Sequence, residues 1–199
     1  MSNPRIISVF GISGVGKSTL ISEARKDVPE SLHLQASALI KGGLRDSATS
    51  SESLRCRPSG EIRTNQDILV DSFWRSVRSE PQTLVIFDGH LVIDTGKELV
   101  EIPQEVIASL RPSLMVHVED DVSKIAARRA QDRRRVRPVR CEETLEQHQR
   151  LSRRLCETYA SALGTETVVY HPDEVALFSD LLNSNSKSTH LPLPPTPLL

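Results

Sequence analysis

The sequence predicts an α/β fold built on a parallel sheet of five strands. Short apolar runs recur along the chain, at residues 6–10, 32–34, 83–87, 114–118 and 167–170. Segments with helical spacing of apolar residues separate these runs, and strands that alternate with helices form parallel sheets. The first run, Ile-Ile-Ser-Val-Phe, is apolar almost throughout, as expected for a central strand with both faces covered.

The helices are predicted from their apolar periodicity and from start and stop signals. We expect a helix over 36–41 that ends at Gly42-Gly43, and a long helix over 142–163 that ends at Gly164. Asp120 and Asp121 can cap the helix that follows the fourth strand. The remaining predicted helices cover residues 18–27, 62–77, 104–110 and 172–182. A short hairpin, 91–94 and 97–102, is expected around Asp94-Thr95-Gly96.

The stretch that follows the first strand, residues 11–19, matches the phosphate-binding pattern G-x-x-x-x-G-K-[ST] at every defined position. Its glycines let backbone N–H groups point at the phosphates of a nucleotide, and the next helix adds its positive N-terminal end. Lys17 can reach the β- and γ-phosphates, and the Ser18 hydroxyl can ligate Mg²⁺. The predicted ATP-binding residues are Gly11, Ser13, Gly14, Val15, Gly16, Lys17, Ser18 and Thr19.

The strand over 83–87 ends in Asp88-Gly89-His90. An acidic residue at the carboxyl end of a buried strand can orient magnesium, so Ser18 and Asp88 are the candidate metal ligands. The alternative is that Asp88 is only a turn residue before glycine. For His90 the alternatives are a bond to an acceptor phosphate or a role in the turn.

Seven arginines gather between Arg128 and Arg140, although the net charge of the chain is only −1. A run of charge usually forms a solvated surface. Between two helices of a phosphoryl-transfer fold, however, arginines can neutralise the transferring group, so we favour a lid over the phosphates. A nucleic-acid patch is less favoured because no aromatic residues interleave with the arginines to stack on bases.

Between Gly42 and Gly60 the sequence is rich in serine and has no periodicity. It is either a plain surface connection or a flap over an acceptor site. The flap is favoured by basic residues that can meet a phosphate, namely Lys41, Arg45, Arg55, Arg57 and Arg63.

Length and composition predict one core, with 199 residues of which 38% are hydrophobic. We expect a domain over residues 1–182 and a disordered Ser- and Pro-rich tail over 183–199. Neither a membrane span nor a signal peptide is recognised, so we expect a cytoplasmic protein without membrane partners. The three cysteines suit neither a disulfide framework nor a zinc site.

With these elements in place, the chain resembles the adenylate kinase group of P-loop nucleoside monophosphate kinases, especially the archaeal type and its bacterial relatives. The resemblance runs from about Ile6 to Tyr170. It rests on the phosphate-binding loop, on Asp88-Gly89-His90, on Arg111-Pro112 before a strand, and on Glu146-Gln147-His148-Gln149 with the downstream Arg153, Tyr159 and Gly164.

The resemblance implies a P-loop NTPase three-layer sandwich: a five-stranded parallel sheet with helices on both faces and an Arg-rich lid. It places the acceptor-binding segment at about 36–80 and the lid at about 124–141. The candidate catalytic residues are Lys17, which comes from the loop motif, and four arginines that the resemblance implies. These are Arg128, Arg129, Arg133 and Arg153. The acceptor-binding candidates are Ser37, Lys41, Arg63, Gln66, Asp88 and His90. Where many members have Thr and Asp near the acceptor, this chain has Ala36 and Ala38.

Three functions are compatible with these features. The first is transfer of the γ-phosphoryl group of ATP, with Mg²⁺, to a nucleoside monophosphate, for which adenosine monophosphate is the leading candidate. The second is transfer by the same fold to a hydroxyl of a nucleoside, a small metabolite or a polynucleotide end, with Asp88 as the base. The third is a non-catalytic ATP-binding switch.

Overall fold

The structure is a computed structural model that describes residues 4–44, 54, 59–80, 82–132 and 137–187, with the side chains of 59–64 and 187 excepted. Its centre is a sheet of five parallel strands in the order β2-β3-β1-β6-β7. This confirms the predicted fold class. The strands are β1 (Arg5–Phe10), β2 (Leu32–Gln35), β3 (Leu84–Asp88), β6 (Leu114–Val118) and β7 (Glu166–Tyr170).

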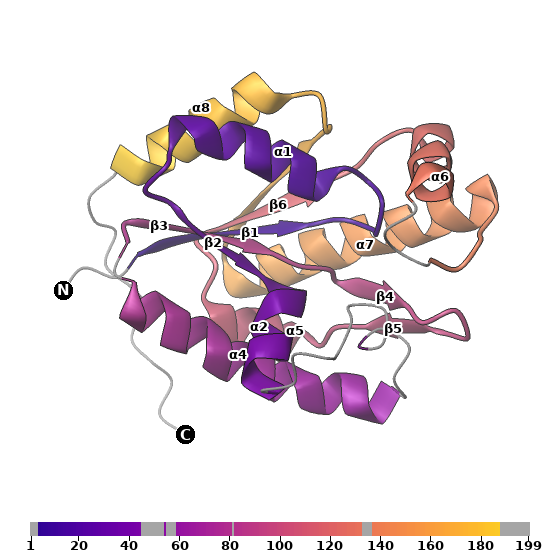
Figure 1. The fold of residues 1–199 in the computed structure, drawn as a ribbon, viewed down its shortest axis with the longest axis horizontal. Helices are drawn as coiled ribbons and strands as arrows, with labels where there is room; N and C mark the ends of the chain where they lie inside the picture. Colours follow the sequence, from indigo (N-terminus) through magenta and orange to yellow (C-terminus); the bar gives the residue numbers. More distant parts are fainter. Residues whose placement is uncertain (1–3, 45–53, 55–58, 81, 133–136, 188–199) are drawn as a thin grey trace.

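Helices cover both faces of this sheet (Figure 1). On one face lie α1 (Lys17–Ala24), a 3₁₀ turn (Arg25–Asp27) and α8 (Val175–Lys187). On the other lie α2 (Ala36–Leu44), α4 (Ser59–Ser79), α5 (Gln104–Leu110) and α7 (Glu142–Leu163). The strands serve both layers because successive side chains point to opposite faces. In β1, Ile7 and Val9 pack toward α1, whereas Ile6 and Phe10 pack toward α4.

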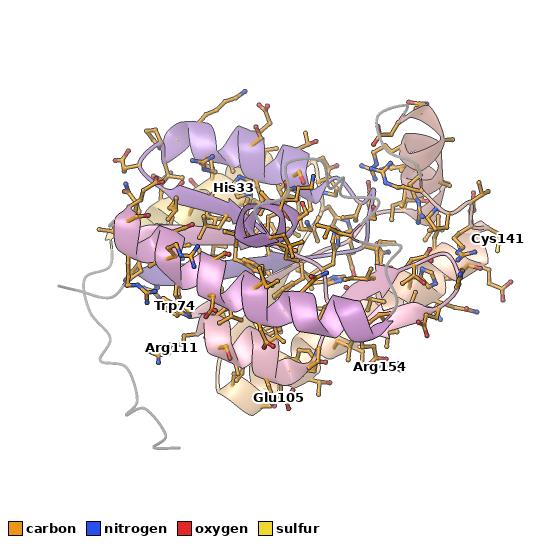
Figure 2. All side chains as sticks on the ribbon, turned by 60° about the horizontal axis from the view of Figure 1, so that its bottom comes forward. His33, Trp74, Glu105, Arg111, Cys141 and Arg154 are labelled. Atoms are coloured by element: carbon orange, nitrogen blue, oxygen red, sulfur yellow. The ribbon has the colours of Figure 1, made fainter. Side chains whose placement is uncertain are left out.

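Aromatic side chains join α4 to the sheet and to α5. The Phe73 ring meets the Phe87 ring edge-on, with 5.8 Å between centroids. Trp74 Nε1 donates to the backbone oxygen of Ser109 at 2.9 Å, and the Arg111 guanidinium lies 5.6 Å from the Trp74 ring centroid. Figure 2 shows Trp74 and Arg111 close together at the surface. These contacts fix α4, which forms one wall of the cleft described below.

Two elements lie beyond the carboxyl edge of the sheet. Strands β4 (Val92–Asp94) and β5 (Leu99–Glu101) form the predicted hairpin, and they pair antiparallel. Helix α6 (Val122–Gln131) follows β6. The Asp121 side chain caps α6 by accepting from the Ser123 amide at 2.8 Å. Asp120, which we expected to share the capping, instead pairs with Arg128 and Lys124.

The prediction that Gly42-Gly43 stops the helix over 36–41 is wrong, because α2 continues through both glycines to Leu44. The reason lies in packing against α4. A Cβ on Gly43 would fall 2.3 Å from Ile68 Cγ2 and 2.6 Å from Ser72 Oγ, so only glycine lets the two helices approach this closely. A Cβ on Gly42 would meet nothing within 4 Å.

These two adjacent glycines give a matched test of that packing. Gly43→Ala is expected to lower the free energy of unfolding by about 1–3 kcal/mol, because a methyl group is forced between packed helices. Gly42→Ala, in the same helix but exposed, is expected to raise it by about 0.5–1 kcal/mol through helix propensity. Urea unfolding of both variants checks this. Equal effects of the same sign would show that helix propensity, not packing, governs the site.

Two other boundaries differ from the predictions. The last helix begins at Val175 and continues to Lys187, so the predicted start at 172 is wrong and residues 183–187 are not a tail. Ser184 and Asn185 donate to backbone oxygens four residues earlier, which accommodates polar side chains within the helix. Residues 188–199, and 45–53 and 55–58 of the proposed flap, lie outside the described residues. None of the described helices is long and apolar enough to cross a membrane.

Candidate active site

The phosphate-binding loop leaves β1 at the carboxyl edge of the sheet and turns directly into α1. Gly14 and Gly16 have φ angles of 88° and 107°, values that favour glycine. A Cβ on Gly14 would lie 2.6 Å from Arg129 Cγ, and one on Gly16 would lie 3.1 Å from Arg128 Nη1. The glycines therefore allow α6 and its arginines to lie directly against the loop.

Asp88 is the centre of the polar contacts at the floor of this site. Its carboxylate pairs with Lys17 Nζ and accepts from Ser18 Oγ at 3.1 Å. Gln35 Nε2 donates to the same carboxylate at 3.5 Å. His33 Nε2 lies 3.7 Å from Asp88 Oδ2, beyond hydrogen-bond distance. The Lys17 and Asp88 side chains are only 6% and 1% exposed.

Two opposing effects set the protonation of Asp88. Burial raises the pKa of this carboxyl group, because a charge is costly away from water. The positive charge and hydrogen bond of Lys17, together with the nearby His33 and His90, outweigh burial and hold the pKa far below its usual range. Asp88 is therefore an anion at neutral pH, suited to bind a cation and poorly suited to take up a proton.

His90 lies beside the first residue of the loop. Its Nδ1 is 2.6 Å from the backbone oxygen of Gly11. Because a carbonyl oxygen can only accept, Nδ1 carries the proton in this contact. His90 thus holds the turn, and it also lines the cleft.

A cleft of about 500 Å³ opens above Asp88 and joins the phosphate-binding loop to a largely apolar wall. Residues 12–19 of the loop line one end. The other end is lined by side chains of α2, α4, β3 and the hairpin, with Leu54. They are Ser37, Ile40, Leu54, Asn65, Gln66, Leu69, Phe87, Val92 and Ile93. The buried amides Asn65 and Gln66 offer hydrogen bonds within this apolar surface.

Arginines cover the loop end of the cleft. Arg128, Arg129 and Arg137 line it. Arg137 Nε donates to Ser13 Oγ at 3.0 Å, so this side chain reaches the loop itself. Each guanidinium also has an acidic neighbour. Arg128 pairs with Asp120, Arg137 Nη2 lies 2.7 Å from Asp132 Oδ2, and Arg129 Nη2 lies 3.9 Å from Asp94 Oδ2.

The structure brings most of the predicted site residues together in this cleft, but not all of them. Lys41 is half-buried on α2 and does not line the cleft. Gly11 does not line it either, and its backbone oxygen meets His90 Nδ1. Arg153, expected to face the phosphates, is exposed and bonds Glu119 and Glu157 at 2.9 and 3.0 Å. Arg133 lies outside the described residues, and the Arg63 side chain is likewise not described. The predicted residues that line the cleft are Ser13, Gly14, Val15, Gly16, Lys17, Ser18, Thr19, Ser37, Gln66, Asp88, His90, Arg128 and Arg129.

Several residues of the cleft were not singled out from the sequence. Gln35 lies one residue beyond the predicted end of its strand. Asp94 was interpreted only as part of a turn, and Arg137 only as one of seven clustered arginines. His148 was named only within the motif that carries the resemblance, and no role was predicted for it. The fold brings Asn65, Asp132 and His148 to the cleft from distant parts of the chain, and short sequence motifs do not reveal such an arrangement.

The oxygen atoms at the end of the loop fit a divalent cation shared with a nucleotide. Ser18 Oγ and Asp88 Oδ2 are adjacent, and both are hard oxygen ligands. No group of three or more His, Cys, Asp or Glu side chains able to hold a metal occurs in the described part of the chain. A Mg²⁺ ion bound by one hydroxyl, one carboxylate and phosphate oxygens needs no such group.

Comparison with known proteins agrees with this site. A family model described as an AAA domain matches residues 10–146. The adenylate kinase of Pyrococcus abyssi is 30% identical over 162 residues, which cover 78% of this chain and 80% of that protein. The adenylate kinase of Thermococcus kodakarensis is 31% identical over 167 residues, which cover 79% and 81%.

Among solved structures, a shikimate kinase from Acinetobacter baumannii in complex with shikimate has a TM-score of 0.54 at 17% identity and covers 94% of this chain and 97% of its own. A deoxyadenosine kinase from M. mycoides with bound dATP has a TM-score of 0.54 at 12% identity, with coverage of 92% and 100%. These similarities show the fold alone. The fold and the loop define a P-loop phosphotransferase. With the curated relatives, they show that the chain belongs to the AAA-domain family, in its adenylate kinase-like group of P-loop kinases.

Proposed function

We propose that the protein transfers the γ-phosphoryl group of ATP to a nucleoside monophosphate, with adenosine monophosphate as the leading candidate. The observation that carries this proposal is the single cleft that runs from the phosphate-binding loop to an apolar wall with buried amides. With the donor phosphates at one end and the base of the acceptor at the other, the phosphate of the acceptor would meet the γ-phosphate of ATP above Asp88. The adenylate kinase relatives support the same choice of substrate class.

The wall offers what a nucleobase needs. A base can pack against Leu69 and Phe87, which are apolar and line the cleft. The Gln66 amide presents a donor and an acceptor side by side, a pattern that complements the adjacent N6 and N7 groups of adenine. An amide can meet an adjacent donor and acceptor on each of the common bases in this way, so the choice of adenine as the leading base is supported by the adenylate kinase relatives.

Catalysis would rest on positioning and on neutralising charge. The loop amides and Lys17 would hold the β- and γ-phosphates, while Arg128, Arg129 and Arg137 would face the transferring group. Ser18 and Asp88 would hold Mg²⁺, which would offset the charge of the phosphates when bound. Phosphate oxygens would compete with Asp88 for Lys17. A monophosphate acceptor needs no strong base.

An acceptor screen tests this proposal directly. The purified protein with Mg²⁺ and ATP is incubated with each ribo- and deoxyribonucleoside monophosphate, with nucleosides and with a 5′-hydroxyl oligonucleotide, and Lys17→Ala serves as the blank. We expect rapid diphosphate formation from adenosine monophosphate. Response to hydroxyl acceptors alone would favour the second function. ATP binding with no turnover above the blank would favour a non-catalytic switch.

The second function has one observation in its favour, the carboxylate of Asp88 in the cleft between the loop and the acceptor wall. A hydroxyl acceptor requires a base at about this place. The low pKa of Asp88 and its bonds to Lys17 and Ser18 weigh against a role as proton acceptor. The Asp88→Asn variant described in the Discussion separates the two functions.

A further inference from the structure

The β4–β5 hairpin and the segment that follows α6 are joined by one carboxylate, that of Asp94. Arg140 donates to it twice, from Nε at 3.1 Å and from Nη2 at 3.0 Å. Arg140 Nη2 also donates to the backbone oxygen of Gly96 at 3.0 Å, in the turn of the same hairpin. A two-pronged bond of this kind fixes orientation as well as distance.

The same carboxylate lies near a second guanidinium, that of Arg129. Arg129 Nη2 is 3.9 Å from Asp94 Oδ2 and donates to the backbone oxygen of Pro138 at 2.9 Å. The Arg129 side chain is only 9% exposed, and its Cγ is the atom that a Cβ on Gly14 would strike. A continuous set of contacts therefore leads from the hairpin through Asp94 and Arg129 to the phosphate-binding loop.

The negative charge of Asp94 offsets the positive charges of the arginines beside it. Burial raises the pKa of Asp94, but the hydrogen bonds from Arg140 and from the Gly96 amide, with nearby positive charge, lower it below its usual value. His148 on α7 also lies near these groups. Burial lowers the pKa of His148, and Arg140 and Arg129 lower it further although Asp94 opposes them, so it is neutral at neutral pH. Asp94 thus supplies negative charge between two guanidinium groups.

We propose that Asp94 is a positioning residue for phosphoryl transfer, which ties the hairpin to Arg140 and holds Arg129 over the phosphate-binding loop. Val92 and Ile93, in the same strand, line the acceptor end of the cleft. The strand that lines the acceptor end of the cleft is therefore linked, through Asp94, to an arginine at the donor end. The proposal rests on the proposed function in taking ATP as the donor.

Asp94→Asn tests this proposal because it keeps the shape of the side chain and removes its charge. We expect kcat to fall by about 10- to 100-fold, since misplacing a catalytic group by about 1 Å has effects of this size. The dissociation constant of Mg-ATP, measured by titration calorimetry without acceptor, is expected to rise by about 3- to 10-fold, typical of a lost contact to a charged ligand. The KM for the acceptor should change less than kcat.

Two further variants separate positioning from a general loss of structure. Glu98→Gln, an exposed change in the same hairpin, is the matched control and should leave both constants unchanged. Arg140→Gln should reproduce the effect of Asp94→Asn. The double variant should be little worse than either single one, because both remove the same contact. Thermal melting of each variant accompanies the assays.

The outcomes are decisive in either direction. Values of kcat and of Mg-ATP affinity within twofold of wild type in folded Asp94→Asn would overturn the proposal. A loss of activity that is explained by a loss of folded protein would also overturn it. Fully additive effects of the two substitutions in the double variant would do the same. If no acceptor reacts with the wild-type protein, the proposed function fails, but the Mg-ATP affinities of the same variants still test the link from Asp94 to the loop.

Discussion

Lys17→Ala is expected to lower phosphoryl transfer by at least about a thousandfold, the scale on which a cation at the transferring phosphate acts in this chemistry. The lysine lies at the start of α1, lines the cleft and is 6% exposed. No other described lysine lines the cleft. Initial rates of diphosphate formation with saturating ATP measure the effect. Turnover near the wild-type rate would refute the kinase assignment.

The same substitution is expected to destabilise the fold, which the assay must separate from catalysis. It leaves Asp88 buried without its cation, and removal of one member of a buried pair costs about 3–5 kcal/mol. Adding Asp88→Asn removes the unpaired charge, so the double variant should recover stability and remain inactive. Lys26→Ala, which changes an exposed lysine paired with Glu23, is the surface control.

Asp88→Asn is expected to lower transfer by about 100-fold or more if the carboxylate positions Mg²⁺, because metal-borne charge stabilisation is worth several kcal/mol. In that case the affinity for Mg-ATP should fall with the rate, and a higher Mg²⁺ concentration should restore part of both. If Asp88 is instead the base for a hydroxyl acceptor, transfer should vanish while Mg-ATP affinity survives. Binding and rate measurements over a range of Mg²⁺ concentrations distinguish these results.

This variant also has an expected effect on acid stability. The pKa of Asp88 is far lower in the folded protein than the value near 3.9 of an unfolded chain. The carboxylate therefore contributes stability that is fully present above about pH 4 and is lost as the pH falls through and below that value. The free energy of unfolding of the wild type should drop more steeply than that of Asp88→Asn on acidification from about pH 4 toward pH 2.

The sequence alone predicts those parts of the site that depend on residues close together in the chain. The phosphate-binding loop, Asp88 at the end of a buried strand and the helix over 142–163 follow from local patterns, and the structure places them as expected. Parallel strands bring their carboxyl ends to one edge, so the meeting of Lys17 with Asp88 follows from the fold class. The roles assigned to these residues stay predictions until they are measured.

Long-range packing accounts for what the sequence did not reveal. Gly43 resembles a helix stop until α4 is seen against it. Asp94 forms a turn with Gly96, and only the fold shows that it also meets Arg140, which follows it by 46 residues. Arg153 resembles a phosphate ligand by family pattern, yet Glu119 and Glu157 engage it here. In each case a partner distant in sequence decides what the residue contacts.

The direction of the outer helices has a practical consequence. Helix α1 begins at the phosphate-binding loop, and α8 lies beside it and likewise runs back from the carboxyl edge of the sheet (Figure 1). The start of β1 and the end of α8 therefore lie at the opposite edge of the sheet (Figure 1), away from the carboxyl ends of the strands, where the cleft lies. A fluorophore or a surface tether introduced near Arg5 or Asn183 would leave the path of substrates clear. The protein is accordingly well arranged for immobilised or single-molecule assays of turnover.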